Sequence, residues 1–170
     1  MDAGDAKAIF PALGKGQVYF DNAGGSQTLG TVIDSISEYL SSSNVQLGGS
    51  YVASQTSTTK YRAGFEAAAR FINCSTDQIV FGSSTTQLFR NLSYTLNFKP
   101  EDEIIVSAVD HEANIGPWLH LAERQGLVVK WWRPKDGKGS LHLDIKHLLT
   151  NRTRLVAVTH ASNILGIHRY

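Results

Sequence analysis

Cysteine, charge and long apolar runs are all scarce in this chain of 170 residues, and each scarcity excludes a class of protein. The single cysteine, Cys74, cannot form a disulfide within the chain and belongs to no CxxC pair, so we interpret it as a structural thiol. No apolar segment approaches the length of a membrane span, and the N-terminus lacks the basic and apolar regions of a secretory signal. We therefore expect a cytoplasmic protein without a membrane anchor.

The charge is small and evenly distributed. Sixteen Lys and Arg residues against fifteen Asp and Glu residues give a net charge of +1 without any block of one sign, so we expect no nucleic-acid partner. The six histidines show no HxxxH or HExxH spacing, and we predict no metal site. The glycine patterns GxGxxG and GxxxxGK[ST] are absent as well, which argues against a nucleotide-binding domain of the common kinds.

The first half of the chain has two stretches with helical spacing of apolar residues. A polar lead-in spans residues 1–16, and a short β-type run, VYFD, follows at residues 18–21. Apolar spacing predicts helices over residues 31–40 and 59–72, with a loop rich in Gly and Ser between them. That loop is either mobile or functional.

From residue 78 onward, strand patterns alternate with helix patterns. The predicted strands cover residues 78–81, 103–108, 127–132 and 154–160, and the predicted helices cover residues 86–97, 114–125 and 143–149. Such alternation predicts an α/β fold with a mostly parallel sheet and flanking helices. In such sheets ligands bind at the carboxyl ends of the strands, so polar residues there are the first candidates for a site.

Three segments follow predicted strands with polar residues. FGSSTTQLFRN carries Thr85 and Thr86 into a helix, where free N–H groups attract a phosphate, although Ser and Thr are equally ordinary helix caps. His111 follows the second strand in DHEANIGPW and is either structural or functional. The last strand ends in VTHASNILG, which presents Ser162 and Asn163.

These segments, together with FDNAGGSQ near the N-terminus, occur in an order that resembles the class V aminotransferase and cysteine desulfurase family of pyridoxal-phosphate (PLP) enzymes. The resemblance covers residues 18–166, and its most specific parts are His-x-Ala-Asn-x-x-Pro-Trp at 111–118 and Thr-His-x-Ser-Asn-x-x-Gly at 159–166. The opening DNAGGSQ is similar to the desulfurase-like subgroup. The fold that the resemblance implies is the large domain of a fold type I PLP-dependent transferase, present here over residues 17–170 and incomplete.

The resemblance also implies roles for particular residues. His111 would stack on the PLP ring and take part in proton transfers, Asn163 would hydrogen-bond the 3-hydroxyl oxygen of PLP, and Thr85 and Thr86 would hold its phosphate. Four residues of the N-terminal loop, Asn22, Ala23, Gly24 and Gly25, would border an amino-acid substrate. The chain departs from the family at two positions, where Arg90 replaces a common Asn and Glu112 replaces the second His of a common His-His pair.

PLP chemistry further needs a Schiff-base lysine and a carboxylate beside the pyridine nitrogen, and neither is found at a suitable place in this sequence. The lysines present have the contexts of surface residues, and Cys74 does not match the family's nucleophile. We therefore expect the N-terminal portion of a longer enzyme, catalytically incomplete as it stands, and a homodimer if complete.

Two other hypotheses remain open. One is a non-catalytic remnant that binds a phosphate-bearing ligand, or that pairs with another chain through an open sheet edge. The other is an unrelated α/β nucleotide-binding domain, which the missing glycine patterns disfavour.

Overall fold

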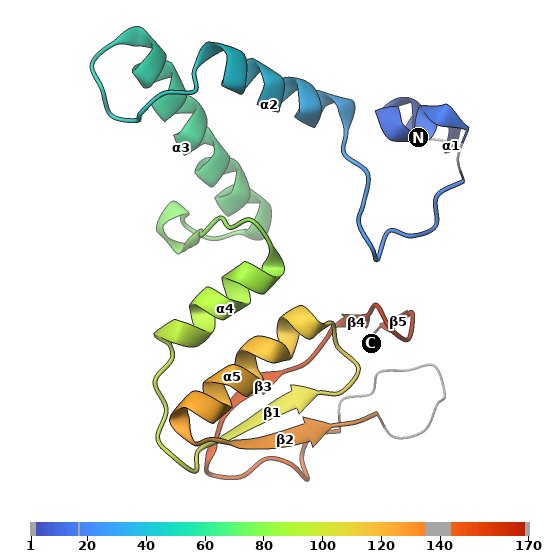
Figure 1. The fold of residues 1–170 in the computed structure, drawn as a ribbon, viewed down its shortest axis with the longest axis vertical. Coiled ribbons are helices and arrows are strands. Elements are labelled where there is room, and N and C mark those ends of the chain that lie inside the picture. Colours follow the sequence, from blue (N-terminus) through green and yellow to red (C-terminus); the bar gives the residue numbers. More distant parts are fainter. Residues whose placement is uncertain (1–2, 17, 135–143, 169–170) are drawn as a thin grey trace. The chain divides into compact units, whose positions relative to one another are not determined.

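The computed structural model describes residues 3–16, 18–134 and 144–168. It divides the chain into two units, Met1–Val80 and Phe81–Tyr170, which are considered one at a time (Figure 1). The predicted domain over residues 17–170 includes most of both units, and its extent stays a prediction. No helix in the described ranges is long and apolar enough to cross a membrane.

The first unit is helical. Its elements are α1 (Ala3–Ala8), η1 (Pro11–Lys15), α2 (Gly30–Ser42), α3 (Val52–Ile72) and η2 (Thr76–Gln78). Helix α2 agrees with its prediction, whereas α3 begins earlier than predicted. The reason is Ser54, whose buried hydroxyl donates to the Gln46 carbonyl at 2.6 Å and accepts from the Gly49 N–H at 2.8 Å. The polar first turn of α3 is thereby tied to the Gly- and Ser-rich loop.

The two strands predicted in this half of the chain are wrong. Residues 18–21, of which all are described, and residues 78–81 form no strand. Three of their apolar side chains are largely exposed, with Val18 at 75%, Phe20 at 92% and Val80 at 74%. An apolar run becomes a strand only where a neighbouring strand satisfies its backbone groups.

The second unit is an α/β structure. Its elements are α4 (Thr85–Thr95), β1 (Glu103–Ser107), η3 (Glu112–Asn114), α5 (Gly116–Gln125), β2 (Val128–Trp132), β3 (Thr153–Ala157), β4 (Ala161–Ser162) and β5 (Ile167–His168). Strands β2, β1 and β3 pair in that order, and both pairings are parallel. The predicted α/β fold with a parallel sheet is therefore confirmed, and a short antiparallel pair, β4 and β5, follows it.

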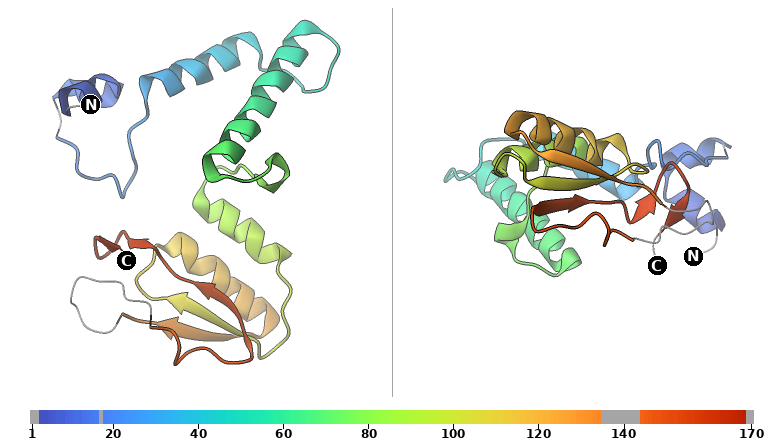
Figure 2. Two further views of the ribbon diagram at one scale, coloured as in Figure 1. Left: turned by 180° about the vertical axis from the view of Figure 1, so that it is seen from behind. Right: turned by 90° about the horizontal axis from the view of Figure 1, so that it is seen from below.

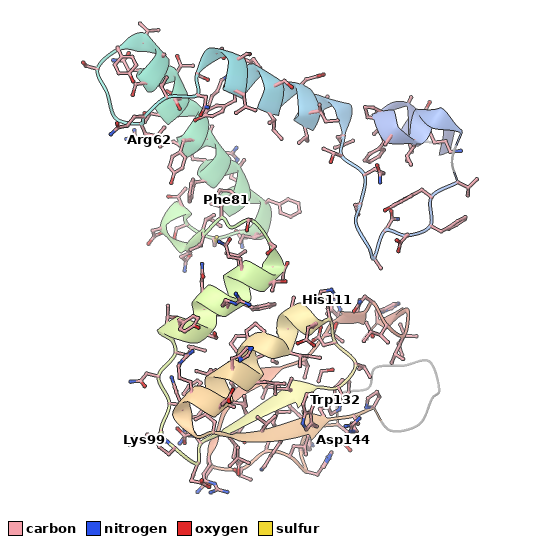
Figure 3. The ribbon with its side chains drawn as sticks, viewed as in Figure 1. Arg62, Phe81, Lys99, His111, Trp132 and Asp144 are labelled. Carbon is pink, nitrogen blue, oxygen red and sulfur yellow. The ribbon has the colours of Figure 1, made fainter. Side chains whose placement is uncertain are left out.

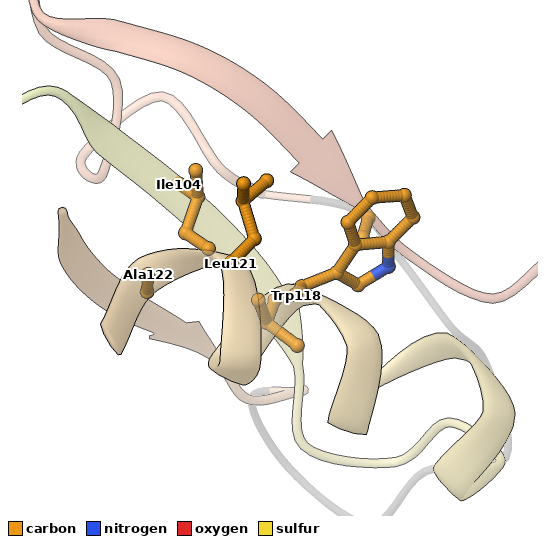
Figure 4. Packing of buried hydrophobic residues seen from close by; sticks show 6 residues of the cluster. Ile104, Trp118, Leu121 and Ala122 are labelled. Atoms are coloured by element: carbon orange, nitrogen blue, oxygen red, sulfur yellow. The ribbon is translucent and has the colours of Figure 1, made fainter. Parts of the chain in front are cut away.

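Helix α5 lies across one face of this sheet (Figure 2). Figure 4 shows Leu121 of α5 beside Ile104 of β1, and Trp118 and Ala122 of α5 belong to the same cluster of buried side chains. Ile105 and Trp132 are buried on the other face of the sheet. Strand β1 is therefore buried on both faces and forms the centre of the unit. Each large apolar side chain buried in this way stabilises the folded state by about 1.5–3 kcal/mol.

The helix predicted over residues 143–149 is wrong for its described part, residues 144–149, which form a turn; Leu143 lies outside the described residues. Leu148 of this segment and Thr150, which follows it, instead form hydrogen bonds with residues of β2 and β1. The Leu148 carbonyl accepts from Lys130 Nζ at 3.0 Å, and the Thr150 hydroxyl donates to Glu103 Oε2 at 2.6 Å.

Glu103, the first residue of β1, is a buried carboxylate with cations on both sides. Its Oε2 lies 2.7 Å from Lys130 Nζ on β2, and its Oε1 lies 2.9 Å from Arg152 Nη2 beside β3. The hydrogen bond from Lys130, followed by that from Thr150, lowers the pKa of Glu103 from 4.5 to about 2. One carboxylate thus links the start of β1 to the middle of β2 and to Arg152, the residue before β3.

Candidate functional site

His111 lies beyond the carboxyl end of β1 and caps the short helix η3 (Figure 3). Its Nδ1 accepts a hydrogen bond from the Ala113 N–H at 3.0 Å. Because an accepting nitrogen carries no proton, the proton of the neutral ring is on Nε2, and the ring is held in one tautomer. The side chain is exposed and available to a ligand.

A chain of side-chain hydrogen bonds holds the turn that carries His111. Asp110 Oδ1 accepts from the His111 N–H at 2.7 Å, and Asp110 Oδ2 accepts from Asn114 Nδ2 at 2.7 Å. Asn114 Oδ1 in turn accepts from Trp118 Nε1 at 2.9 Å. Asp110 is 6% exposed and Trp118 3%, so this chain of bonds is largely shielded from water.

The sequence pattern predicted no role for Asp110, Asn114 or Trp118. Burial of Asp110 shows that it is not solvated, whereas Glu112 is exposed. The available signal was the spacing, because Asp110, Asn114 and Trp118 follow one another at intervals of four residues. That interval places side chains on one face of a helical turn.

At the start of α4, the residues that cap the helix are not the residues predicted to bind phosphate. Ser84 is the N-cap and accepts from the Gln87 N–H at 3.1 Å, while Gln87 Oε1 accepts from the Ser83 N–H at 2.8 Å. Thr85 and Thr86 are the first two residues of the helix, and their hydroxyls form no hydrogen bond with any described residue. Their hydroxyls and the free N–H groups of the first turn are suited to an anion.

Asn163 lies in the turn between β4 and β5 and is exposed. The turn is anchored by Ser162, whose hydroxyl donates to the Val109 carbonyl at 2.7 Å and accepts from the Leu165 N–H at 3.1 Å. Val109 precedes His111 by two residues, so this bond joins the loop after β3 to the loop after β1. Like Asp110, Ser162 holds a candidate loop in place, a role that the sequence pattern did not predict.

The substrate loop predicted at Asn22–Gly25 belongs to the first unit and has its own internal structure. Asp21 lies against Gly24, where an added Cβ would come within 2.6 Å of Asp21 Oδ2. The Tyr19 hydroxyl lies within hydrogen-bonding distance of the Gly25 carbonyl. Asn22 lines a cavity of about 250 Å³, while Ala23, Gly24 and Gly25 are exposed.

Within the second unit, the structure brings three of the predicted elements together. Strands β1 and β3 are adjacent and parallel, so the loops with His111 and Asn163 leave the sheet at the same edge. Thr86 of α4 and Glu112, the residue after His111, line one cavity. Imidazole, carboxamide and hydroxyl groups on neighbouring elements are chemically suited to a flat polar ring that carries a phosphate.

Known proteins resemble this chain in both sequence and structure. Residues 18–169 match the aminotransferase class-V family. The aminotransferase-like protein FGM3 of Gibberella zeae is 52% identical over 95% of this chain and 42% of its own length. The cysteine desulfurase-like protein ustD of Aspergillus flavus is 36% identical over 98% of this chain and 39% of its own length.

A solved structure shows the same fold. The apo structure of the cysteine desulfurase from Thermococcus onnurineus NA1 matches with a TM-score of 0.86 at 27% identity, over 99% of this chain and 42% of that chain. The chain thus spans about two fifths of the length of these relatives, at 39–42%. Its α/β fold is that of a fold type I PLP-dependent transferase, as predicted, and the chain belongs to the aminotransferase class-V family.

Proposed function

We propose that this chain provides the residues that hold PLP and orient an amino-acid substrate in a cytoplasmic, homodimeric enzyme of the class-V family. The observation that carries the proposal is the hydrogen bond from Ser162 to Val109, because it fixes the loops of Asn163 and His111 at one edge of the sheet. PLP, when bound, supplies an electron sink for bonds at the substrate's α-carbon. The sulfur of cysteine is one possible leaving group, and transamination, racemisation and other eliminations are alternatives.

The phosphate of PLP would be held at the start of α4. Thr85 and Thr86 offer hydroxyls and first-turn N–H groups, and the dipole of an eleven-residue helix favours an anion at that end. The Ser84 hydroxyl accepts the Gln87 N–H, and Gln87 Oε1 accepts the Ser83 N–H. Phosphate binding at Thr85 and Thr86 therefore does not compete with these capping bonds.

His111 would lie against the ring face and hold or move a proton at Nε2. Its orientation is set by the Ala113 N–H and by the Asp110 hydrogen bonds, which together limit rotation of the turn. Asn163 would hydrogen-bond the ring's 3-hydroxyl oxygen through its carboxamide. The Asn22–Gly25 loop would border the substrate. The Schiff-base lysine and the carboxylate that PLP chemistry needs would come from a part of the enzyme outside these residues.

The first experiment concerns the protein isolated from its source. We would reduce it with borohydride and measure its intact mass. A pyridoxyl adduct on a chain heavier than 18.6 kDa is expected. A mass of 18.6 kDa without an adduct would contradict the proposal and favour a remnant that binds other ligands.

Variants of the protein expressed from its complete gene test the individual roles. His111→Ala is expected to lower turnover by roughly 10²-fold, the lower end for a lost acid–base group, with a smaller effect on PLP retention. Asn163→Ala should shift the absorption maximum of the bound cofactor. Thr86→Ala should weaken retention of PLP, whereas Thr95→Ala at the other end of α4 is the matched control. Unchanged turnover in His111→Ala, or equal PLP retention in the two threonine variants, would count against the assignments.

A further inference from the structure

A cavity of about 470 Å³ lies between α4 and α5 in the second unit. Arg90 and Tyr94 of α4 line it from one side, and Glu112, His120 and Arg124 line it from the other. Its volume falls in the range of small-molecule sites. Thr86, whose hydroxyl is proposed above to hold the phosphate of PLP, also lines this cavity, whereas its charged lining residues Arg90, His120 and Arg124 have no proposed role.

One end of the cavity is closed by protein contacts. The Arg124 guanidinium lies 4.4 Å from the centre of the Tyr94 ring, and its Nη2 donates to the Ser93 carbonyl at 2.8 Å. His120 has a distant acidic neighbour, Glu123, at 4.0 Å. Arg124 and His120 therefore already have partners within the protein.

Arg90 and Glu112 differ from these residues. Neither side chain forms an ion pair or a hydrogen bond with any residue that the structure describes, although both line the same cavity. The Glu112 carboxylate lies over the first turn of α5, where its Oε1 is 2.8 Å from the position that a Cβ on Gly116 would occupy. Two opposite charges thus border one cavity without meeting. They are also the two positions at which the chain departs from the family's common residues.

From this arrangement we propose that the cavity binds a small zwitterion of the α-amino-acid class, with its carboxylate on Arg90 and its ammonium group on Glu112. A simple anion would be repelled by Glu112 and a simple cation by Arg90, whereas a zwitterion satisfies both charges. The arginine offers a bidentate contact to a carboxylate, and the cavity of about 470 Å³ is large enough to admit an amino acid. The site adjoins the proposed phosphate position at Thr86 but depends on the charges of Arg90 and Glu112, which have no proposed role in holding PLP.

The test is calorimetric titration of the holoenzyme with L-proline, a zwitterion whose secondary amine is a poor partner for a carbonyl cofactor. We expect one saturable site. N-acetyl-L-proline lacks the ammonium charge and L-prolinamide lacks the carboxylate, and both should bind at least about tenfold more weakly, as should L-proline to Arg90→Gln and Glu112→Gln. Arg133→Gln, at an exposed arginine outside the cavity, is the matched control and should bind as the parent does. Circular dichroism verifies that each variant is folded.

The opposite results overturn the proposal. Saturation absent up to roughly 10 mM L-proline would mean that the two charges are merely solvated. Equal binding of N-acetyl-L-proline would identify a plain anion site. Binding lost in His111→Ala but kept in Arg90→Gln would place the amino acid at His111, and that result would leave the proposed function standing while removing this one.

Discussion

Glu103 is a buried carboxylate whose side chain is 2% exposed and whose two oxygens contact cations from different elements. Burial of a charge destabilises a protein unless partners compensate, and here Lys130, Arg152 and Thr150 do so. Removing the carboxylate would leave Lys130, itself only 24% exposed, without its acidic partner. The residue therefore stabilises the sheet through charge where its neighbours stabilise it through apolar burial.

The pH dependence of stability follows from this carboxylate. Its pKa is lowered from 4.5 to about 2, so the charged form is favoured in the folded state and its stabilising effect is complete above pH 4.5. As the pH falls from 4.5 toward 2, that effect is lost. We expect Glu103→Gln to lower the urea midpoint of unfolding at pH 7 and to lose this difference from the parent near pH 2.

Glu101→Gln is the control, since Glu101 is a neighbouring exposed glutamate outside this network. Urea titrations at several pH values between 2 and 7 provide the measurement. A midpoint difference for Glu103→Gln that stays constant over this range would refute the electrostatic explanation.

At the scale of elements, the start of α4 depends on close contact between the turn and the helix. An added Cβ at Gly82 would come within 2.6 Å of Leu88 Cδ2 and 2.8 Å of its Cγ. A side chain at position 82 would therefore force the Leu88 side chain to move. Since Ser84, Thr85 and Thr86 follow directly, such a movement would disturb the start of α4, where the candidate phosphate groups lie.

Gly82→Ala is accordingly expected to destabilise the protein by about 1–3 kcal/mol through overpacking. The additional change Leu88→Ala should restore part of that loss by removing the contact. Gly64→Ala is a matched control, because Gly64 lies within α3 with nothing near its would-be Cβ, and this change should stabilise by about 0.5–1 kcal/mol. Thermal unfolding of the four proteins measures these effects, and equal shifts for the two glycine variants would contradict the packing argument.

The helices and strands that could be predicted are those whose own apolar pattern is enough to identify them. Strands β1, β2 and β3 and helices α4 and α5 have strong apolar patterns, and all five were predicted close to their bounds. The apolar runs at 18–21 and 78–81 have the same local pattern but no pairing strand, and the pattern does not carry that information. The turn within residues 144–149 is likewise held by a residue distant in sequence, because the Leu148 carbonyl accepts a hydrogen bond from Lys130.

The candidate site was predictable in part for the same reason. His111 and Asn163 follow strands, and strand order alone placed them at the carboxyl edge. The bond from Ser162 to Val109 joins residues 53 positions apart, so no local pattern contains it. Side chains that position other side chains are recognised only when the fold brings them together.

At the scale of the whole molecule, the apolar core is concentrated in the second unit. Both clusters of buried apolar residues found in the described ranges belong to it. In the first unit α2 has no buried residue, and its apolar side chains are largely exposed, from 42% at Val32 to 60% at Leu40. Local stability follows the density of buried apolar contacts, so the two units should differ in it.

Hydrogen exchange of the 170-residue chain can measure that difference. The amides of Ile104, Ile105 and Val106 in β1 should exchange most slowly, because the strand is central and buried on both faces. Those of α2 should exchange fastest among the longer helices. Protection of α2 equal to that of β1 would contradict the prediction.

The charged network of Glu103 and the loop of His111 lie at opposite ends of the same strand, β1. The residues that stabilise the sheet and the residues of the candidate site therefore belong to separate segments of the sequence. A library that randomises the loops after β1 and β3 would vary the candidate site while the Glu103 network at the other end of β1 is left unchanged. Conversely, tolerance to acid could be engineered at the first residues of the strands with no amino acid of the candidate site replaced.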